Sequence, residues 1–313
     1  MNASPSSPAK VFIDGEAGTT GLGIRERLAG MAGIEVRSID PVLRKDPQAR
    51  AAIMAEVDVV ILCLPDGAAK ESVALAASLG DRAPRILDAS TAHRVSEGWA
   101  YGFPELTPTQ ADAIARATHV ANPGCYPTGA IALMRPLVDA GVLPRDYPVA
   151  VHAVSGYSGG GKSMIEAYES GTAPAYELYA LALTHKHLPE MQRYSLLSRV
   201  PIFVPSVGRF RQGMIVSVGL HADLLPGRPS RRQVEDVLAT RYAGQPYVKV
   251  VPVTDDDAFK LEPEALNDTN LLELRVYGNE ASGQILLCAR LDNLGKGASG
   301  AAVQNLKLML GRD

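Results

Sequence analysis

A cysteine in a tight turn is the residue of this sequence best suited to chemistry. Cys125 lies between Pro123-Gly124 and Tyr126-Pro127, which predicts a sharply turned backbone because proline fixes φ and glycine tolerates angles that other residues avoid. An apolar helix is expected from Thr128 onward, so Cys125 falls at or just before a helix N-terminus, where the dipole favours a thiolate. Burial as an inert side chain is the alternative, but the flanking turn residues favour a nucleophile.

A pair of histidines could supply proton transfer. His185 and His187 precede a helix predicted to open at Pro189 and to run through Leu197. His187 is nearer to the positive end of this helix, which lowers the pKa of an imidazole and keeps it available as a base. We expect His187 to be the acid–base partner of Cys125 and His185 to orient the substrate, with the reverse assignment and a solvated loop as alternatives. Two histidines without a cysteine or carboxylate frame make a poor metal site, so no metal is expected.

A glycine-rich turn near the N-terminus is typical of a nucleotide site. Residues 10–14 predict a strand and residues 22–28 predict a helix. The glycine spacing between them, G-x-x-G-x-x-G, is looser than G-x-G-x-x-G, and a plain strand–helix turn is the alternative. The flanking strand and helix favour binding of a nucleotide phosphate by backbone N–H groups at the helix start. The turn residues expected to bind the cofactor are Gly15, Ala17, Gly18, Thr19, Thr20 and Gly21.

The end of the next predicted strand, residues 33–39, bears on the choice of cofactor. An NAD site often places an acidic residue there, whereas this chain has Arg37 and Ser38, followed by Arg44 and Lys45. These residues suit the 2′-phosphate of NADPH, although the cations could instead form a solvated surface. We assign Ser38 and Arg44 to the cofactor.

Strands and helices alternate through the first third of the chain. Residues 57–64 are an apolar run typical of a strand buried on both faces, and residues 85–90 predict another strand. The alternation predicts an α/β fold with a parallel sheet, whose ligands lie at the carboxyl ends of the strands. Leu64 and Pro65 follow one such end and are expected near the cofactor. Arg94 follows another and could bind an anionic substrate group or only solvent.

The pattern beyond residue 143 changes to strands of a mixed sheet, with weaker alternation. Residues 155–163 form a polar, glycine-rich loop that could surround an oxyanion with backbone N–H groups. Its letters match a phosphate-binding loop of nucleoside triphosphate enzymes, but no acidic strand end is placed to hold magnesium, so a chance match is favoured. A second glycine-rich turn, residues 292–300, precedes the C-terminal helix. Its Asn293, with Gly295 beside it, could hold the cofactor's carboxamide.

Composition is compatible with a cytoplasmic enzyme. The length of 313 residues suggests two domains. Cys63, Cys125 and Cys288 are scattered without metal-type spacing, so neither a disulfide framework nor a zinc site is supported and a reducing compartment is expected. The net charge of -3 gives no reason to invoke nucleic acid or an anionic membrane. No apolar run could cross a bilayer, and residues 1–8 are expected to be a loose tail rather than a signal peptide.

These segments together resemble one family over nearly the whole chain. The matching segments are residues 15–21, 101–105, 122–128, 155–159, 185–190 and 292–298. They are similar to the short type of N-acetyl-γ-glutamyl-phosphate reductase, in the semialdehyde dehydrogenase superfamily. The resemblance implies NADPH-dependent reduction of N-acetyl-L-glutamyl 5-phosphate to the semialdehyde in arginine biosynthesis, by a homodimer or homotetramer.

The resemblance also implies two domains. Residues 1–121 would form an NADP-binding Rossmann domain with a parallel sheet, and the C-terminal helix, residues 298–313, would pack back on it. Residues 122–297 would form an α+β catalytic and dimerisation domain with a mixed sheet. The residues expected to bind substrate are Arg94, Asn122, Ser155, Gly156 and Lys162. The longer type of the family usually has arginine where this chain has Lys162 and Lys186.

The expected chemistry agrees with the residue types. Cys125 would displace phosphate from an acyl phosphate and form a thioester, to which a nicotinamide hydride adds. The histidine pair would accept the thiol proton and later protonate the thiohemiacetal oxygen, while backbone N–H groups at the cysteine turn stabilise the oxyanion. One alternative is a sibling reductase of aspartyl or N-acetylaminoadipyl phosphate. Another is a non-catalytic NADP-sensing regulator, which would need neither Cys125 nor the histidines.

Overall fold

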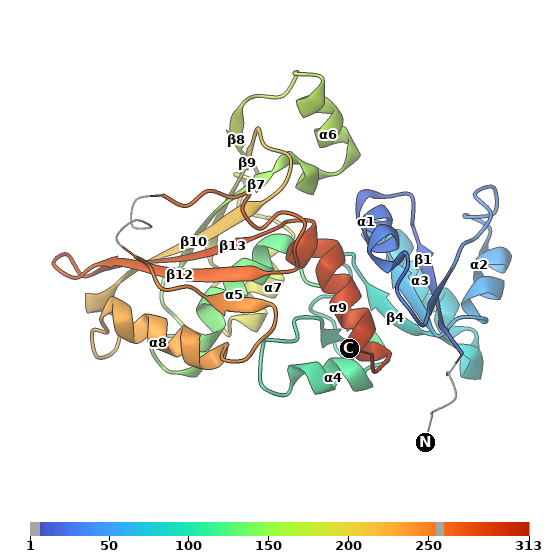
Figure 1. The fold of residues 1–313 in the computed structure, drawn as a ribbon, viewed down its shortest axis with the longest axis horizontal. Coiled ribbons are helices and arrows are strands. Elements are labelled where there is room, and N and C mark those ends of the chain that lie inside the picture. Colours follow the sequence, from blue (N-terminus) through green and yellow to red (C-terminus); the bar gives the residue numbers. More distant parts are fainter. Residues whose placement is uncertain (1–6, 255–259, 313) are drawn as a thin grey trace. The chain divides into compact units, whose positions relative to one another are not determined.

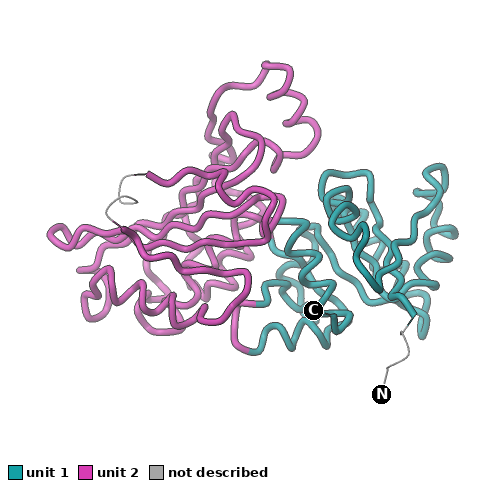
Figure 2. The backbone as a smooth tube through the Cα atoms, viewed as in Figure 1, with its two compact units in different colours: residues 1–104, 109–123, 298–313 teal, residues 105–108, 124–297 magenta. Residues whose placement is uncertain are grey.

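The computed structural model describes residues 7–254 and 260–312, and the chain divides into two units (Figure 1, Figure 2). Unit 1 comprises residues 1–104, 109–123 and 298–313, and unit 2 comprises residues 105–108 and 124–297. Most of the expected N-terminal tail lies outside the described residues. Within the described part of the chain, no helix is long and apolar enough to cross a membrane.

Unit 1 is built on a parallel sheet. Its strands are β1 (Ala9–Asp14), β2 (Ile34–Arg37), β3 (Val59–Leu62), β4 (Arg85–Asp88), β5 (Ala100–Tyr101) and β6 (His119–Ala121). Every neighbouring pair in the order β2-β1-β3-β4-β6-β5 is parallel. All four residues of β3 are buried, as expected for an apolar strand covered on both faces.

Helices cover both faces of this sheet. They are α1 (Thr19–Leu28), α2 (Pro47–Met54), α3 (Asp66–Ala77), α4 (Gln110–Arg116) and α9 (Gly300–Met309). One apolar core includes Ile24 of α1, Ile114 of α4 and Leu306 of α9. The core on the other face includes Met54 of α2 and Ala69 of α3. The predicted Rossmann-type α/β arrangement is therefore confirmed.

Unit 2 contains a mixed sheet of seven strands, as predicted. The strands are β7 (Ala150–Gly156), β8 (Tyr176–Leu178), β9 (Ile202–Gly208), β10 (Met214–His221), β11 (Val248–Val250), β12 (Leu272–Asn279) and β13 (Gln284–Leu291). Their order is β11-β12-β13-β10-β7-β9-β8. The pairs β7 with β9 and β11 with β12 are parallel, and the other pairs are antiparallel.

One face of this sheet packs against α5 (Cys125–Asp139) and α8 (Arg231–Arg241). Gly129 allows α5 to lie close to β10, because a Cβ at this position would come within 2.9 Å of the Val216 side chain. Tyr242, directly after α8, donates its hydroxyl hydrogen bond to the Ala132 carbonyl of α5 at 2.9 Å. The helix that begins at the cysteine is therefore fixed against the sheet and against α8.

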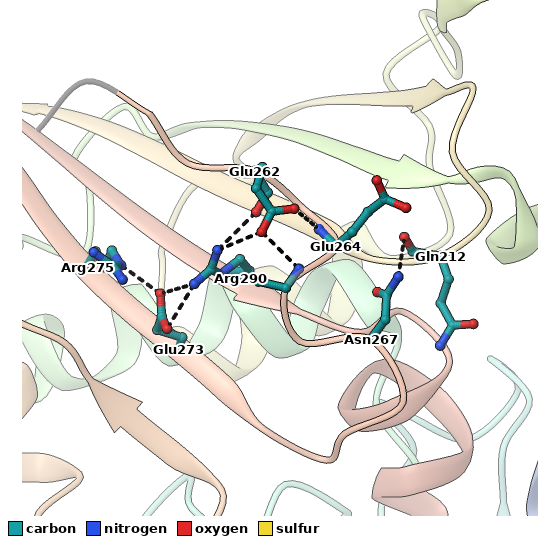
Figure 3. A network of polar contacts seen from close by, with 8 residues as sticks. Gln212, Glu262, Glu264, Asn267, Glu273, Arg275 and Arg290 are labelled. Carbon is teal, nitrogen blue, oxygen red and sulfur yellow. Dashed lines mark hydrogen bonds and ion pairs between the residues drawn. The ribbon is translucent and has the colours of Figure 1, made fainter. Parts of the chain in front are cut away.

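The opposite face of this sheet, away from α5 and α8, carries more polar and exposed side chains. We call it the open face. Figure 3 shows Arg290 of β13 bound to Glu273 of β12 and to Glu262, while Arg275 of β12 also binds Glu273. The apolar side chains Ile202 and Leu286 are 55% and 42% exposed on this face. It thus combines ion pairs with uncovered apolar side chains.

Residues 155–163, predicted to be a polar loop, are more regular than expected. Strand β7 continues to Gly156, a 3₁₀ turn spans Tyr157–Gly160, and α6 spans Lys162–Glu169. The N–H groups of Gly156, Tyr157 and Ser158 donate to the carbonyls of residues 213, 210 and 211. These long-range hydrogen bonds order the glycine-rich backbone and already use three of the N–H groups of residues 155–163 that could have surrounded an oxyanion.

Candidate active site

The cysteine turn is fixed by hydrogen bonds on both sides of Gly124. Cys125 is the first residue of α5 and is partly exposed, and Gly124 is its N-cap. The Gly124 N–H donates to Oε2 of Glu190 at 3.1 Å, and the Gly124 carbonyl accepts from the Thr128 hydroxyl at 2.9 Å. The thiol thus projects from a helix N-terminus, as the sequence predicts, and a buried carboxylate holds the preceding residue.

The backbone of the C-terminal glycine turn lies against the nucleophile candidate. A Cβ on Gly297 would come within 2.9 Å of Cβ of Cys125. The Gly297 N–H donates to the Asp292 carbonyl at 2.9 Å. Only a residue without a side chain permits this approach.

The histidine pair lies at the start of α7 (Leu188–Tyr194). His187 is the N-cap residue and is 6% exposed, while His185 is partly exposed. Their ring centroids are 4.6 Å apart, and Nδ1 of His185 accepts a hydrogen bond from the His187 backbone N–H at 3.1 Å. Glu190, which binds the cysteine turn, belongs to the same helix. Helix α7 therefore connects both histidines to the turn that contains Cys125.

Two tyrosines lie beside the cysteine and the histidines. The ring of Tyr126 is 6.2 Å from that of His185 and 6.0 Å from that of His187, between centroids. Its hydroxyl accepts a hydrogen bond from Tyr179 at 3.1 Å. Burial raises the pKa of both hydroxyls, and the neighbouring Cys125 side chain raises each pKa further. The two phenols are therefore neutral, and both O–H groups are already donated: that of Tyr179 to Tyr126, and that of Tyr126 to the Ser206 carbonyl at 3.1 Å.

Sequence reasoning missed Glu190, Tyr126 and Tyr179 as site residues. Glu190 and Tyr126 belong to segments that resemble the reductase family, so those motifs were an available signal. Tyr179 follows a three-residue strand in a segment without any motif, and only the fold places it beside Tyr126.

The predicted substrate residues divide between the two units. In unit 2, Ser155 is 3% exposed, Gly156 packs against the backbone of Arg211, and Lys162 is exposed as the first residue of α6. In unit 1, Arg94 is 8% exposed and its Nε donates to the Asn122 carbonyl at 2.9 Å.

Both polar atoms of the Asn122 side chain form hydrogen bonds within unit 1. Its Nδ2 donates to the Ala298 carbonyl at 3.1 Å, and its Oδ1 accepts from Asn305 at 3.0 Å. Arg94 and Asn122 are thus part of one buried polar cluster at the carboxyl end of β6.

The turn between β1 and α1 has the backbone that a phosphate site requires. Gly15 has φ +93°, and a Cβ on it would come within 2.4 Å of the Cys63 carbonyl oxygen. A Cβ on Gly21 would come within 2.6 Å of the Gly15 carbonyl oxygen. Gly18 is the N-cap of α1, no side chain caps this helix, and Ala17 is exposed. Thr19 and Thr20 are the first residues of α1, so their N–H groups lie at its positive end.

At the end of β2, Ser38 is bound to a carboxylate and to an arginine that the sequence analysis did not name. Ser38 donates its hydroxyl to Oε2 of Glu16 at 3.1 Å and accepts from Nη1 of Arg25 at 2.7 Å. Arg25 and Glu16 also form an ion pair. Arg44 lies further along the chain and is exposed. Ser38 is therefore beside the glycine turn, and Arg25 is a cation that sequence reasoning overlooked there.

The remaining cofactor candidates lie in different units. Leu64 and Pro65 follow β3 in unit 1, and Pro65 is the N-cap of α3. Asn293 lies in unit 2, where its Oδ1 accepts from the Gly213 N–H at 2.7 Å and its Nδ2 donates to Ser158 at 2.9 Å. A Cβ on Gly295 would come within 2.0 Å of the Thr269 carbonyl oxygen, so glycine is required there.

A metal centre is not formed by the described residues. No group of three or more histidine, cysteine, aspartate or glutamate side chains within 7–254 and 260–312 is arranged to hold a metal ion. All three cysteines are free thiols.

Two protein-family models match the chain. Residues 20–114 match the NAD binding domain of semialdehyde dehydrogenase, and residues 125–293 match the semialdehyde dehydrogenase dimerisation domain. The second match alone covers more than half of the chain.

Named relatives are similar over almost the full length. N-acetyl-gamma-glutamyl-phosphate reductase 2 of Pseudomonas putida is 51% identical over 305 residues, which cover 96% of this chain and 96% of that protein. The N-acetyl-gamma-glutamyl-phosphate reductase of Brucella suis is 55% identical over 309 residues, which cover 97% of this chain and 99% of that protein.

Solved structures confirm the fold at lower identity. Aspartate semialdehyde dehydrogenase II of Vibrio cholerae, complexed with ASA, has a TM-score of 0.74 at 17% identity and covers 98% of this chain and 99% of its own. Aspartate semialdehyde dehydrogenase with NADP from Candida albicans has a TM-score of 0.66 at 14% identity and covers 97% and 99%.

Proposed function

The chain belongs to the N-acetyl-γ-glutamyl-phosphate reductases, and we propose that Cys125 is the nucleophile of its reaction. The reaction is the NADPH-dependent reduction of N-acetyl-L-glutamyl 5-phosphate to N-acetyl-L-glutamate 5-semialdehyde and phosphate, a step of arginine biosynthesis. One observation supports the assignment above others: Cys125 opens α5, and Glu190 connects its turn to the helix that follows the two histidines.

The first step forms a thioester on Cys125. The thiolate attacks the acyl carbon, the carbon–sulfur bond forms, and the bond from carbon to the phosphate oxygen breaks as phosphate leaves. The N–H groups at the start of α5 are assigned to the developing oxyanion, since they lie at the positive end of the helix. Pro127 has no N–H, so the donors come from the residues before it.

Reduction then requires a proton as well as a hydride. When bound, NADPH supplies the hydride to the thioester carbon. His187 is assigned to protonate the resulting oxygen and to remove that proton as the carbon–sulfur bond breaks and Cys125 leaves as thiolate. His185, whose Nδ1 is bound to the His187 backbone, is assigned to orient the substrate.

The residues of unit 1 fit a dinucleotide. The uncapped start of α1 and the close-packed turn of Gly15 and Gly21 support pyrophosphate binding by residues 15–21. Ser38 and Arg44 are assigned to the 2′-phosphate, with Arg25 as a further cation bound to Ser38. Leu64 and Pro65 would line the same strand ends. Asn293 and Gly295 of unit 2 are assigned to the nicotinamide carboxamide.

Cofactor binding and catalysis are assigned to different parts of the chain. We assign residues 1–121, with 298–313, to NADP binding and residues 122–297 to catalysis and dimerisation. Arg94, Asn122, Ser155, Gly156 and Lys162 are assigned to the substrate, with Lys162 as a cation for its phosphate.

Assembly and location are proposed from the same units. Exposed Ile202 and Leu286 on the open face of the unit 2 sheet support assembly of two or four copies through that face. The three free thiols support a reducing compartment, for which we propose the cytoplasm.

A substrate comparison tests the function. NADPH oxidation should be fastest with N-acetylglutamyl phosphate when it is run in parallel with aspartyl and N-acetylaminoadipyl phosphates. Faster turnover of either of the other acyl phosphates would reassign the substrate. If the protein bound NADPH but turned over none of them, it would be a nucleotide-sensing regulator instead.

A further inference from the structure

A buried ion pair that the proposed reaction does not use lies in unit 2. Nζ of Lys296 donates to the two carboxylate oxygens of Glu105 at 2.8 and 2.9 Å, and the two residues are 1% and 3% exposed. The ammonium also lies 5.4 Å from the ring centroid of Tyr247. Desolvation of two charges opposes folding and can exceed the attraction between them. A pair of this kind is therefore weak evidence for stability and suggests a positional role.

Lys296 stands at the point where the C-terminal glycine turn meets Cys125. It belongs to the π-helical turn Gly295–Ser299, a rare conformation that is frequent at functional sites. Its neighbour Gly297 lies against Cys125: a Cβ added to Gly297 would come within 2.9 Å of Cβ of Cys125. Gly295 and Gly297 have no side chains, so within residues 295–297 the backbone can be held through a side chain only at Lys296.

The other member of the pair is itself anchored. Glu105 belongs to the short segment 105–108, which is part of unit 2 although the chain on either side belongs to unit 1. The carbonyl of Leu106 in this segment accepts a hydrogen bond from Nη1 of Arg241 of α8 at 2.9 Å, and Leu106 is 5% exposed. Glu105 therefore offers a fixed carboxylate to Lys296.

We propose that Lys296 is a positioning residue for the nucleophile. Its ion pair with Glu105 holds the backbone of Gly297 against Cys125 and so restricts where the thiol can lie. The proposal rests on the role of Cys125 given above. Position matters here because a displacement of about 1 Å at a reacting group can cost about 10²-fold in rate.

The test compares Lys296→Met, Glu105→Gln and the double variant with Arg231→Met, a control that breaks a different pair with a buried carboxylate, Glu235. In Lys296→Met, kcat should fall by about 10- to 100-fold. The KM for the acyl phosphate should remain nearly unchanged, because the substrate contacts are kept.

Thiol labelling gives a readout that does not depend on turnover. Iodoacetamide should label Cys125 faster in Lys296→Met than in the parent, because the covering backbone is loosened, while Cys63 and Cys288 stay unlabelled. The double variant should recover the urea midpoint, since no unpaired charge stays buried, but it should not recover kcat.

Two results would overturn the proposal. One is that kcat and Cys125 labelling in Lys296→Met match those of Arg231→Met, and the other is recovery of kcat in the double variant. If Lys296→Met exposes all three thiols, it has unfolded, and Glu105→Gln, which keeps the side-chain shape, decides by the same criteria. Failure of the function itself would look different, because the parent protein would not consume the acyl phosphate.

Discussion

The proposed reaction depends on one of three thiols, and the three have different environments. Cys288 lies in β13 and Cys63 directly follows β3, and burial raises the pKa of each to about 12, with Asp88 and Asp14 adding to the rise at Cys63. Cys125 instead is the first residue of a helix, where the helix dipole favours the charged form of the thiol. Only the last environment favours a thiolate near neutral pH.

Thiol alkylation should therefore single out Cys125. Because the pKa of Cys63 and that of Cys288 are raised to about 12, both thiols stay protonated at mildly alkaline pH, and iodoacetamide should then add one group, on Cys125. Alkylation or Cys125→Ser should lower kcat on the order of 10⁴-fold or more, as loss of a nucleophile does elsewhere, and should leave NADPH binding intact. Intact-mass and peptide mass spectrometry locate the label, and label on either other cysteine would count against the assignment.

The two histidines should separate in their kinetics. His187→Asn should lower kcat by ~10²–10⁴-fold, the usual cost of losing a general acid–base, whereas His185→Asn should mainly raise KM. The side-by-side pH profiles of kcat measure this. A larger kcat loss in His185→Asn, with His187→Asn changing mainly KM, would reverse the roles.

The sequence predicts some site residues and misses others for a physical reason. The positions of Cys125 and His187 at helix starts follow from local turn chemistry, and such signals are contained in a few consecutive residues. Tyr179 meets Tyr126 through pairing of β8 with β9. No local pattern encodes such a contact.

Elements with strong apolar patterns are predicted within one or two residues. Strand β3, Val59–Leu62, lies within the expected 57–64 and is two residues shorter at each end. The short strands β5 and β8 are missed, because two or three residues are too few to show a period. Helix α1 begins three residues earlier than expected, at Thr19, since Gly18 already serves as its N-cap.

The packing of α5 on the sheet gives a prediction for one glycine. Gly129→Ala should destabilise the protein by about 1–3 kcal/mol, because the new methyl would come within 2.9 Å of Val216. Gly67→Ala in α3 is the matched control: nothing lies within 4 Å of its added Cβ, and alanine favours a helix. Urea denaturation followed by circular dichroism measures both, and equal midpoints would contradict this packing.

The end of β2 gives a prediction for cofactor choice. Ser38→Asp should lower kcat/KM with NADPH by at least about tenfold, because a carboxylate repels the 2′-phosphate, and should spare NADH. Glu71→Gln, at an exposed position of α3, is the control and should change neither value. Parent protein that used NADH and NADPH equally would refute the assignment of this region.

At the scale of the whole molecule, the sequence correctly predicts a parallel sheet and a mixed sheet. The succession of strands and helices indicates the first, and the change of pattern beyond residue 143, together with the family resemblance, indicates the second. Residues 105–108 belong to unit 2 although the chain on either side belongs to unit 1. The sequence could not predict this, because Glu105 is paired with Lys296, which is far away in the chain.

Assembly gives a prediction at this scale. Leu286→Arg should weaken self-association, because it places a charge on the apolar part of the open face, where Leu286 is 42% exposed. Light scattering across a concentration series measures the mass. Val42→Arg, at an exposed position of unit 1, is the control that should leave the mass unchanged. If Leu286→Arg associates as the parent does, the open face is not the interface between copies.

Trapping of the acyl-enzyme tests the central claim most directly. The protein is mixed with N-acetylglutamyl phosphate without NADPH, quenched in acid, digested and examined by mass spectrometry. We predict an N-acetylglutamyl thioester on the peptide that contains Cys125, and its loss when NADPH is added before the quench. Acylation of Cys63 or Cys288, or turnover without any acylated cysteine, would contradict the account.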